Sequence, residues 1–238
     1  MSEPEIRVAL VDDQPLLRTG FGMILDAEQG IQVVGEASDG AAAVQLVARL
    51  RPDVVLMDVR MPVMDGIEAT RRIVAEFPET RVIILTTFDL DEYAFNGLTA
   101  GASAFLLKDV DPDELARAVR LVASGDAVVA PRVTRRLLEA YVRPAGAVPG
   151  SAPGVASVPD VDPAAARAIA ELTPREREIL EAMAAGRSNQ EIATAFFVSE
   201  ATVKTHVRRV LAKLALRDRV QAVVFSYEHG IVTPGDAA

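Results

Sequence analysis

The chain has 238 residues, half of them hydrophobic, so it can bury one large core or two smaller ones without covalent cross-links. It contains no cysteine, which excludes disulfides, thiolate metal sites and thiol catalysis, and we expect oxygen ligands in any metal site. The N-terminal stretch is acidic, and no run approaches the roughly 20 apolar residues of a membrane span, so we expect a cytoplasmic protein without a membrane segment.

The formal net charge of −9 is unfavourable for nucleic-acid binding, but the acid is unevenly distributed. Residues 1–171 carry 16 Lys and Arg against 26 Asp and Glu, whereas residues 172–238 carry nine against eight. Between Thr202 and Arg219, six basic residues accompany a single acid, Asp218. The C-terminal third therefore contains a basic segment that the average conceals.

The first half of the chain alternates short apolar runs with segments of helical spacing. The apolar runs are rich in Val, Ile and Leu and predict buried parallel strands at Ile6–Val11, Ile31–Ala37, Val54–Met57, Val82–Leu85 and Ala104–Leu107. The predicted helices are Pro15–Glu28, Gly40–Leu50, Gly66–Glu76, Asp91–Ala100 and Pro112–Ser124. Five βα units with right-handed crossovers predict an α/β fold whose sheet has the order 2-1-3-4-5 and helices on both faces.

The following segment separates this unit from a second, all-helical one. A basic helical stretch at Arg132–Tyr141 precedes a stretch at Pro144–Pro163 that is dense in Pro, Gly, Ala and Ser and lacks an amphipathic period. We therefore predict a first domain at 5–125, a linker with a helical start at 126–171, and a second domain at 172–235.

Capping signals mark the helices of the second domain. Capping boxes at Thr173–Glu176 and Ser188–Glu191 open the first two helices. The third helix opens at Ser199 and runs to about Ala215, and the fourth spans Arg217–Glu228. Four short helices separated by tight turns predict a helix-turn-helix domain.

Polar residues follow the predicted strands at the edge where the carboxyl ends meet, which is where parallel sheets gather functional groups. They are Asp12 and Asp13 after the first strand, Asp58 after the third, Thr86 after the fourth and Lys108 after the fifth. Three converging carboxylates repel one another unless a cation neutralises them, and oxygen ligands without nearby His or Cys favour Mg²⁺. With a lysine and a hydroxyl beside them, these acids are suited to holding a phosphoryl group.

In such a site Asp58 would be the nucleophile towards a phosphoryl donor, and the product would be an aspartyl phosphate. Each residue also has a purely structural explanation. The two aspartates after the first strand could cap a helix, Asp58 could be a turn acid, Thr86 a strand residue and Lys108 a solvated strand end. Their coincidence at neighbouring strand ends favours a common site over separate structural roles.

Residues 5–125 resemble a response-regulator receiver domain through the strings VALVDDQPLLRTG, VVLMDVRMPVMDG, VIILTTFD and AGASAFLLKD. The resemblance implies a flavodoxin-like fold and the following roles: a Mg²⁺ site formed by Asp12, Asp13, Asp58 and the backbone carbonyl of Arg60, Asp58 as phosphoacceptor, Thr86 as switch hydroxyl, Phe105 as switch aromatic, and Lys108 as the cation that pairs with the phosphoryl group. An ordinary core role remains the alternative for Phe105. Val63 departs from the family pattern, because many members have glycine there.

The third helix of the second domain has an apolar back and a basic front. The predicted buried face carries Val203, Val207, Val210, Leu211 and Leu214, at steps of three and four residues. The opposite face carries Lys204, Thr205, Arg208, Arg209 and Lys213. An ordinary solvated helix is the alternative, but the near absence of acids on this face favours a recognition helix in the major groove.

The segment Leu172–Pro234 resembles the LuxR or NarL type of DNA-binding domain through the strings LTPREREIL, GRSNQEIA, VSEATVKTHVRRVLAKL and RDRVQAVV. The resemblance implies that Lys204, Thr205 and Arg208 read bases, and that Thr202, Arg209 and Lys213 contact phosphates. One side of the fourth helix carries Val220, Val223, Val224 and Tyr227. That side is either core or, as in the family, partly a dimer surface.

Together the two resemblances imply a response regulator of the NarL/FixJ subfamily, which is a transcription regulator and not a turnover enzyme. They imply a sensor histidine kinase and double-stranded promoter DNA as partners, and a homodimer when phosphorylated. A nucleotide-binding enzyme on the same sheet would need a glycine-rich loop where this chain has Asp12-Asp13-Gln14-Pro15. A receiver with a vestigial pocket, acting only as an interaction module, is the other alternative, and the intact set of acids, Thr86 and Lys108 disfavours it.

Overall fold

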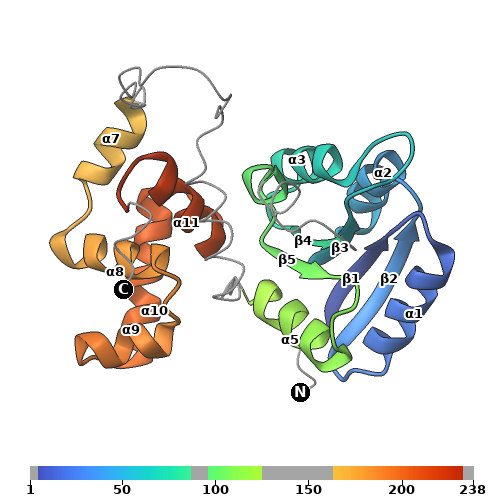
Figure 1. Cartoon of the computed structure of the whole chain (residues 1–238), viewed down its shortest axis with the longest axis horizontal. Coiled ribbons are helices and arrows are strands. Elements are labelled where there is room, and N and C mark those ends of the chain that lie inside the picture. The colour runs from blue at the N-terminus through green and yellow to red at the C-terminus, as the bar shows by residue number, and fades with distance from the viewer. Residues whose placement is uncertain (1–4, 87–95, 125–162, 233–238) are drawn as a thin grey trace, which may run out of the picture. The chain divides into compact units, whose positions relative to one another are not determined.

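The computed structural model describes residues 5–86, 96–124 and 163–232 (Figure 1). The chain divides into two compact units, residues 1–129 and 130–238, and each is described by itself. The helix predicted at Arg132–Tyr141 lies outside the described residues, as does nearly all of the stretch predicted at Pro144–Pro163. No helix in the described part of the chain is long and apolar enough to span a membrane.

The first unit contains a five-stranded parallel sheet. Its strands are β1 (Ile6–Val11), β2 (Ile31–Ala37), β3 (Val54–Asp58), β4 (Arg81–Thr86) and β5 (Ala104–Leu107). Their order is β2-β1-β3-β4-β5, which confirms the predicted topology. Strands β3 and β4 run slightly beyond their predicted ends, so that Asp58 and Thr86 belong to the sheet itself and their backbones are held by strand pairing.

Helices cover both faces of the sheet. Helices α1 (Pro15–Asp26) and α5 (Pro112–Ala123) lie on one face, and α2 (Gly40–Leu50) and α3 (Gly66–Glu76) lie on the other (Figure 1). The helix predicted at Asp91–Ala100 is described only from residue 96, and residues 96–99 are helical. The core under α1 and α5 joins apolar residues of the strands to both helices: Val8, Leu10, Leu56, Ile83 and Leu85 with Phe21, Leu25, Leu115 and Val119.

Side-chain caps fix where these helices begin. Asp39, Asp65 and Asp111 each stand at the N-cap and accept a hydrogen bond from a backbone N–H of the first turn. Pro112 occupies the first position of α5, where its missing N–H costs nothing. Asp65 and Asp111 thereby fix the residues at which α3 and α5 begin after strands β3 and β5.

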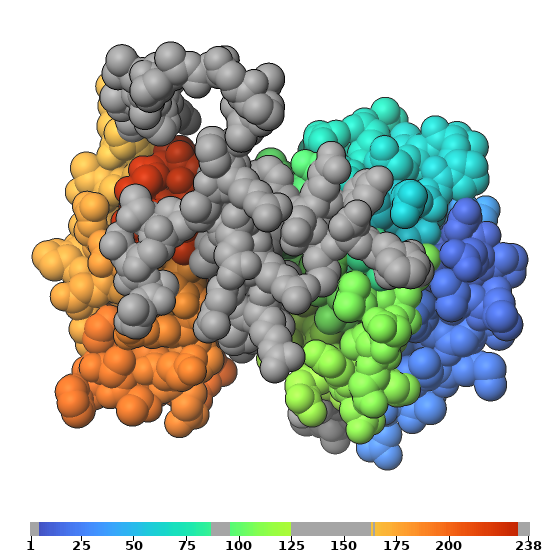
Figure 2. Space-filling view, in the orientation of Figure 1, coloured from blue at the N-terminus to red at the C-terminus, as the bar shows by residue number. Residues whose placement is uncertain are grey.

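The second unit is helical. Its helices are α7 (Pro163–Ala170), α8 (Pro174–Ala184), α9 (Asn189–Phe196), α10 (Glu200–Lys213) and α11 (Arg219–Glu228). Both predicted capping boxes are present, and Ser199 caps α10. Figure 2 shows the outer surface of both units, with the helical unit coloured from yellow to red.

Helix α7 lies within the segment 126–171 predicted as linker, in which a helix was predicted only at the start. Ala168, Ile169 and Leu172, in and just after this helix, pack against the core of the second unit. The linker was predicted from the stretch at Pro144–Pro163, which is dense in Pro, Gly, Ala and Ser. Alanine is the strongest helix former, and the short alanine-rich run that follows forms a helix where it has a core to pack on.

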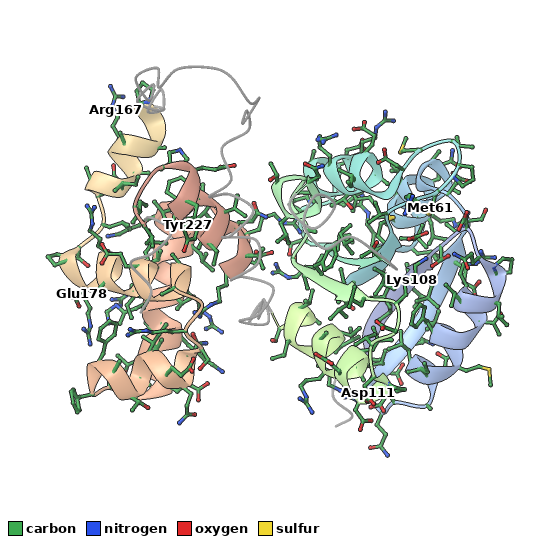
Figure 3. The ribbon with its side chains drawn as sticks, in the orientation of Figure 1. Met61, Lys108, Asp111, Arg167, Glu178 and Tyr227 are labelled. Atoms are coloured by element: carbon green, nitrogen blue, oxygen red, sulfur yellow. The ribbon has the colours of Figure 1, made fainter. Side chains whose placement is uncertain are left out.

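One face of α11 belongs to the core. Val220, Val223 and Tyr227 are buried, whereas Val224 is half-buried. The Tyr227 hydroxyl donates a hydrogen bond of 3.2 Å to the carbonyl oxygen of Ala184 at the end of α8, and Figure 3 marks Tyr227 on α11. Of the two interpretations left open for this face, the packing within the unit supports a core role for these three residues.

Candidate functional site

Three carboxylates converge at the carboxyl edge of the sheet. Asp12, Asp13 and Asp58 each offer one oxygen, and these oxygens lie within 4.8 Å of one another. Asp12 and Asp13 follow β1, and Asp58 ends the neighbouring strand β3. Asp12 and Asp58 are buried, whereas Asp13 is exposed. The structure thus brings together the three acids that the sequence placed at the ends of two different strands.

The ammonium group of Lys108 lies among these acids. Its Nζ is 2.6 Å from Oδ2 of Asp12 and 3.0 Å from Oδ1 of Asp58, and the three side chains are at most 7% exposed. The Lys108 backbone N–H donates to the carbonyl oxygen of Thr86 at 2.8 Å, which ties the residue to β4 (Lys108 is labelled in Figure 3). The cation is therefore fixed both by its backbone and by its charge.

Burial raises the pKa of the Asp58 carboxyl above its ordinary value, and the negative charge of Asp12 raises it further. Lys108 and the Val59 N–H, which donates to Asp58 Oδ1 at 2.8 Å, act in the opposite direction but do not outweigh burial. When all groups are ionised, three negative charges and one positive charge leave an excess of two negative charges. A divalent cation would balance that excess.

The donor set fits a hard cation. Apart from its ion pair with Lys108, Oδ2 of Asp12 accepts no hydrogen bond from the described residues, and Oδ1 accepts one from the Gln14 N–H at 2.9 Å. All the clustered ligand atoms are carboxylate oxygens, which Mg²⁺ prefers. Arg60 lies two residues beyond Asp58 with an exposed side chain, and no contact tests the predicted role of its carbonyl.

Thr86 and Phe105 lie on the same face of neighbouring strands. Phe105 on β5 pairs with Ile84 on β4, and Thr86 follows Ile84 by two positions, so all three point to the face opposite Ile83 and Leu85. Thr86 and Phe105 are both buried. A hydroxyl at the acidic edge and an aromatic ring one step inward are thus adjacent, as a coupled switch requires, although burial alone is equally compatible with a core role for Phe105.

Helix α10 presents the predicted basic face. Val203, Val210 and Leu214 are buried, and Val207 and Leu211 pack against the same core. On the other side Thr202, Thr205, Arg208 and Arg209 are exposed, and Lys204 forms an ion pair of 3.4 Å with Glu200 one turn earlier. Among the described residues, Arg208 and Arg209 have no acidic partner, so their charge is available to a polyanion.

Lys213 differs from the other cations of α10. Its Nζ lies 2.7 Å from Oε2 of the buried Glu176 and 3.0 Å from the carbonyl oxygen of Glu171. The Lys213 ammonium, followed by the hydrogen bonds from Thr173, lowers the pKa of Glu176 to about 2. The structure therefore gives Lys213, a predicted phosphate contact, a partner inside its own domain.

Both units of the chain are similar to known protein families. The chain matches the family described as response regulator receiver domain over residues 8–120, and that described as bacterial regulatory proteins, luxR family, over residues 170–226. It is 43% identical over 233 residues to the uncharacterized transcriptional regulatory protein YxjL of Bacillus subtilis, covering 98% of this chain and 100% of that protein. The chain belongs to the response-regulator family of transcription regulators.

Two further proteins resemble this response regulator along its length. The transcriptional regulatory protein DegU of Brevibacillus brevis is 39% identical over 234 residues, covering 98% of this chain and 97% of DegU. The crystal structure of the response regulator ChrA, from a heme-sensing two-component system, has 33% identity and a TM-score of 0.50, covering 97% of this chain and 100% of ChrA. The combination of a receiver with a LuxR-type domain makes this chain a phosphorylation-dependent, DNA-binding transcription regulator.

Gly66 shapes the site of this response regulator, although it is not among the predicted site residues. Gly66 opens α3 directly against the end of β3, and a Cβ atom there would lie 1.9 Å from the carbonyl oxygen of Asp58. The Gly66 N–H also donates to the Val59 carbonyl at 2.9 Å. Only glycine permits this approach, and the signal available in the sequence was a glycine at the first position of a predicted helix.

Proposed function

We propose that Asp58 accepts a phosphoryl group from a sensor histidine kinase, and that Asp12, Asp13, Asp58 and the backbone carbonyl of Arg60 hold the Mg²⁺ ion that this transfer needs. The observation that carries the proposal is the buried Asp58 carboxylate within an oxygen-only cluster, with the Lys108 ammonium 3.0 Å away. In this role the chain accepts and slowly loses an aspartyl phosphate, and it is not a turnover enzyme. Its kinase and its DNA would both meet it in the cytoplasm.

In the transfer, an Asp58 oxygen forms a bond to phosphorus while the bond from phosphorus to the imidazole nitrogen of the donor breaks, and the nitrogen keeps the electron pair. When bound, Mg²⁺ supplies positive charge that offsets the charge developing on the phosphoryl oxygens. Lys108 can pair with one of those oxygens because its Nζ already lies beside Asp58. The Thr86 hydroxyl, on the neighbouring strand β4, can donate to another.

The phosphoryl group would be read out through Thr86 and Phe105. Movement of the hydroxyl towards the phosphoryl oxygens vacates space on the face that it shares with Phe105, and the ring can then turn inward. The resulting change of the receiver surface would shift the equilibrium of dimerisation or of domain docking. In a homodimer, two DNA-binding domains would engage half-sites about one helical turn, roughly 10 bp, apart.

Within α10 we assign base reading to Lys204, Thr205 and Arg208, and phosphate contacts to Thr202 and Arg209. The exposed positions of Thr205, Arg208 and Arg209 support this division, since their side chains can reach a duplex without rearrangement of the domain. Lys213 is left out of the set, because a phosphate contact would require its ammonium to leave Glu176.

The phosphoacceptor role is tested by solution mass in an analytical ultracentrifuge, with and without Mg²⁺ and beryllofluoride, for the wild type and Asp58→Asn. We expect the wild type alone to shift from monomer towards dimer, because beryllofluoride mimics the phosphoryl group only on an aspartate. A wild type that binds neither Mg²⁺ nor beryllofluoride would overturn the proposal. In that case the receiver would be an interaction module with a vestigial pocket.

The DNA-reading role is tested by selecting duplexes from a random library and measuring affinity over a range of salt. Arg208→Ala should relax the selected sequence, at a cost of about 1–3 kcal/mol on the preferred site. Arg209→Ala should weaken all duplexes alike and reduce the salt slope by about one. Equal loss of selectivity in both variants would contradict the assignment.

A further inference from the structure

Arg18 of α1 connects the acidic site to the end of β2. Its Nη1 donates to the backbone carbonyl oxygen of Asp12 at 2.6 Å, and its Nε lies 3.0 Å from Oε2 of Glu36, the residue before the last of β2. The Arg18 side chain is only 16% exposed although it is charged. One guanidinium therefore joins three segments, α1, the end of β2 and the loop after β1.

Each polar group of Asp12 has a partner, and Arg18 supplies the last of them. The Asp12 N–H donates to the Ala37 carbonyl at 3.2 Å, and its two carboxylate oxygens are engaged by the Gln14 N–H and by Lys108. Arg18 engages the remaining polar group, the carbonyl oxygen. That carbonyl belongs to the peptide that joins Asp12 to Asp13, so Arg18 fixes the plane of this peptide.

Asp13 depends on that peptide plane. Its carboxylate is exposed, and no hydrogen bond or ion pair with a described residue holds it, yet one of its oxygens lies within 4.8 Å of those of Asp12 and Asp58. A side chain without contacts of its own is placed by its backbone. We propose that Arg18 is a positioning residue for the cation site, acting by fixing the Asp12–Asp13 peptide so that the Asp13 carboxylate faces the cluster.

This inference rests on the proposed Mg²⁺ site. Because Arg18 is charged, the direction in which its removal changes the Mg²⁺ affinity distinguishes positioning from a simple charge effect. A guanidinium near the acids repels an incoming cation, and Glu36 offsets only part of that charge. If Arg18 acted through charge alone, its removal would tighten Mg²⁺ binding. If it acts by positioning, its removal weakens Mg²⁺ binding, as loss of an outer-shell partner of a ligand commonly does by about tenfold or more.

The experiment titrates the full-length protein with MgCl₂ and follows the backbone amide resonances around the site. We expect Arg18→Ala to raise the Kd for Mg²⁺ about tenfold. Arg18→Lys should also raise it, because a single ammonium lacks the fork that reaches a carboxylate and a carbonyl together. The matched control is Arg120→Ala, since Arg120 likewise pairs with a carboxylate, Glu28, and donates to a carbonyl, Gln29, but both lie just before β2, at the other edge of the sheet.

A second substitution separates positioning from general loosening of the fold. In the Asp13→Asn background the carboxylate that Arg18 places is gone, so adding Arg18→Ala should change the Mg²⁺ Kd less than twofold. An equal loss in both backgrounds, or tighter binding by Arg18→Ala, would overturn the inference. If the wild type itself binds no Mg²⁺, the proposed function fails instead, and the two failures are thereby distinguished.

Discussion

The Nζ atom of Lys213 lies 2.7 Å from Oε2 of Glu176, and this pair joins the last residue of α10 to the first turn of α8. The same carboxylate oxygen accepts a hydrogen bond of 2.9 Å from the Thr173 N–H, so Glu176 is at once the third residue of a capping box and an interhelical ion partner. The buried carboxylate of Glu176 therefore adds a polar link between α10 and α8 to the hydrophobic core that the two helices share.

Replacing either partner should destabilise the helical unit. Lys213→Ala leaves the Glu176 carboxylate, only 5% exposed, without its counter-ion, and we expect a loss of about 1–3 kcal/mol in the free energy of unfolding. Urea unfolding followed by far-UV circular dichroism measures this loss. Arg177→Ala is the matched control, since its ion pair with Glu181 is about half exposed on both sides and should contribute less than about 0.5 kcal/mol. Equal stability of the two variants would refute this role for Lys213.

The same pair predicts a pH dependence. The folded-state pKa of Glu176 is about 2 against an ordinary 4.5, so the unfolded chain binds the proton more readily. The stabilisation is therefore complete above about pH 4.5, declines as the pH falls, and is lost near pH 2. Thermal unfolding of the wild type and of Glu176→Gln between these limits should give Tm values that converge towards the acid end. A constant difference in Tm would contradict the assignment.

Val63 in the loop between β3 and α3 predicts a stabilising substitution. This residue has φ +68° and an exposed fraction of 89%, so a β-branched side chain occupies left-handed backbone without burying anything. Glycine adopts the left-handed backbone without steric cost, although it also makes the unfolded chain more flexible. The first effect should be the larger, so Val63→Gly should raise the free energy of unfolding by about 0.5–1 kcal/mol. Chemical denaturation measures the change, and a destabilised variant would show that Val63 makes contacts in solution that offset its backbone.

Adding a single methyl group at Gly66 should disrupt the acidic site. In Gly66→Ala the new Cβ would overlap the Asp58 carbonyl, so the end of β3 must move and beryllofluoride binding should be lost or reduced more than tenfold. Gly20→Ala in α1 is the control, because a Cβ there meets nothing within 4 Å and alanine favours the helix. Retention of beryllofluoride binding by Gly66→Ala would show that the strand end tolerates displacement.

The sequence allowed the strands and the acidic edge to be predicted because both follow from local patterns. The apolar runs before Asp12 and Asp58 are too short for helices, and parallel topology then brings these acids to one edge. Arg18 was not predicted, since its partner Glu36 lies 18 residues away on another element. Lys213 was assigned to the basic front of its helix by spacing, and spacing cannot reveal an acid on a different helix, such as Glu176.

In the unmodified receiver, the Lys108 ammonium is the counter-ion of two of the three clustered carboxylates. The Lys108 ammonium already neutralises part of the charge of Asp12 and Asp58. An incoming metal cation must therefore compete with an ammonium group that is covalently attached beside the site. If Mg²⁺ binds here as proposed, its apparent affinity would be that of an exchange with the ammonium, and would be weaker than three carboxylates alone would provide. On the proposed function, a cation that took the place of the ammonium would leave Lys108 free to pair with the phosphoryl group, so occupancy of the proposed metal site and readiness for phosphorylation would rise together.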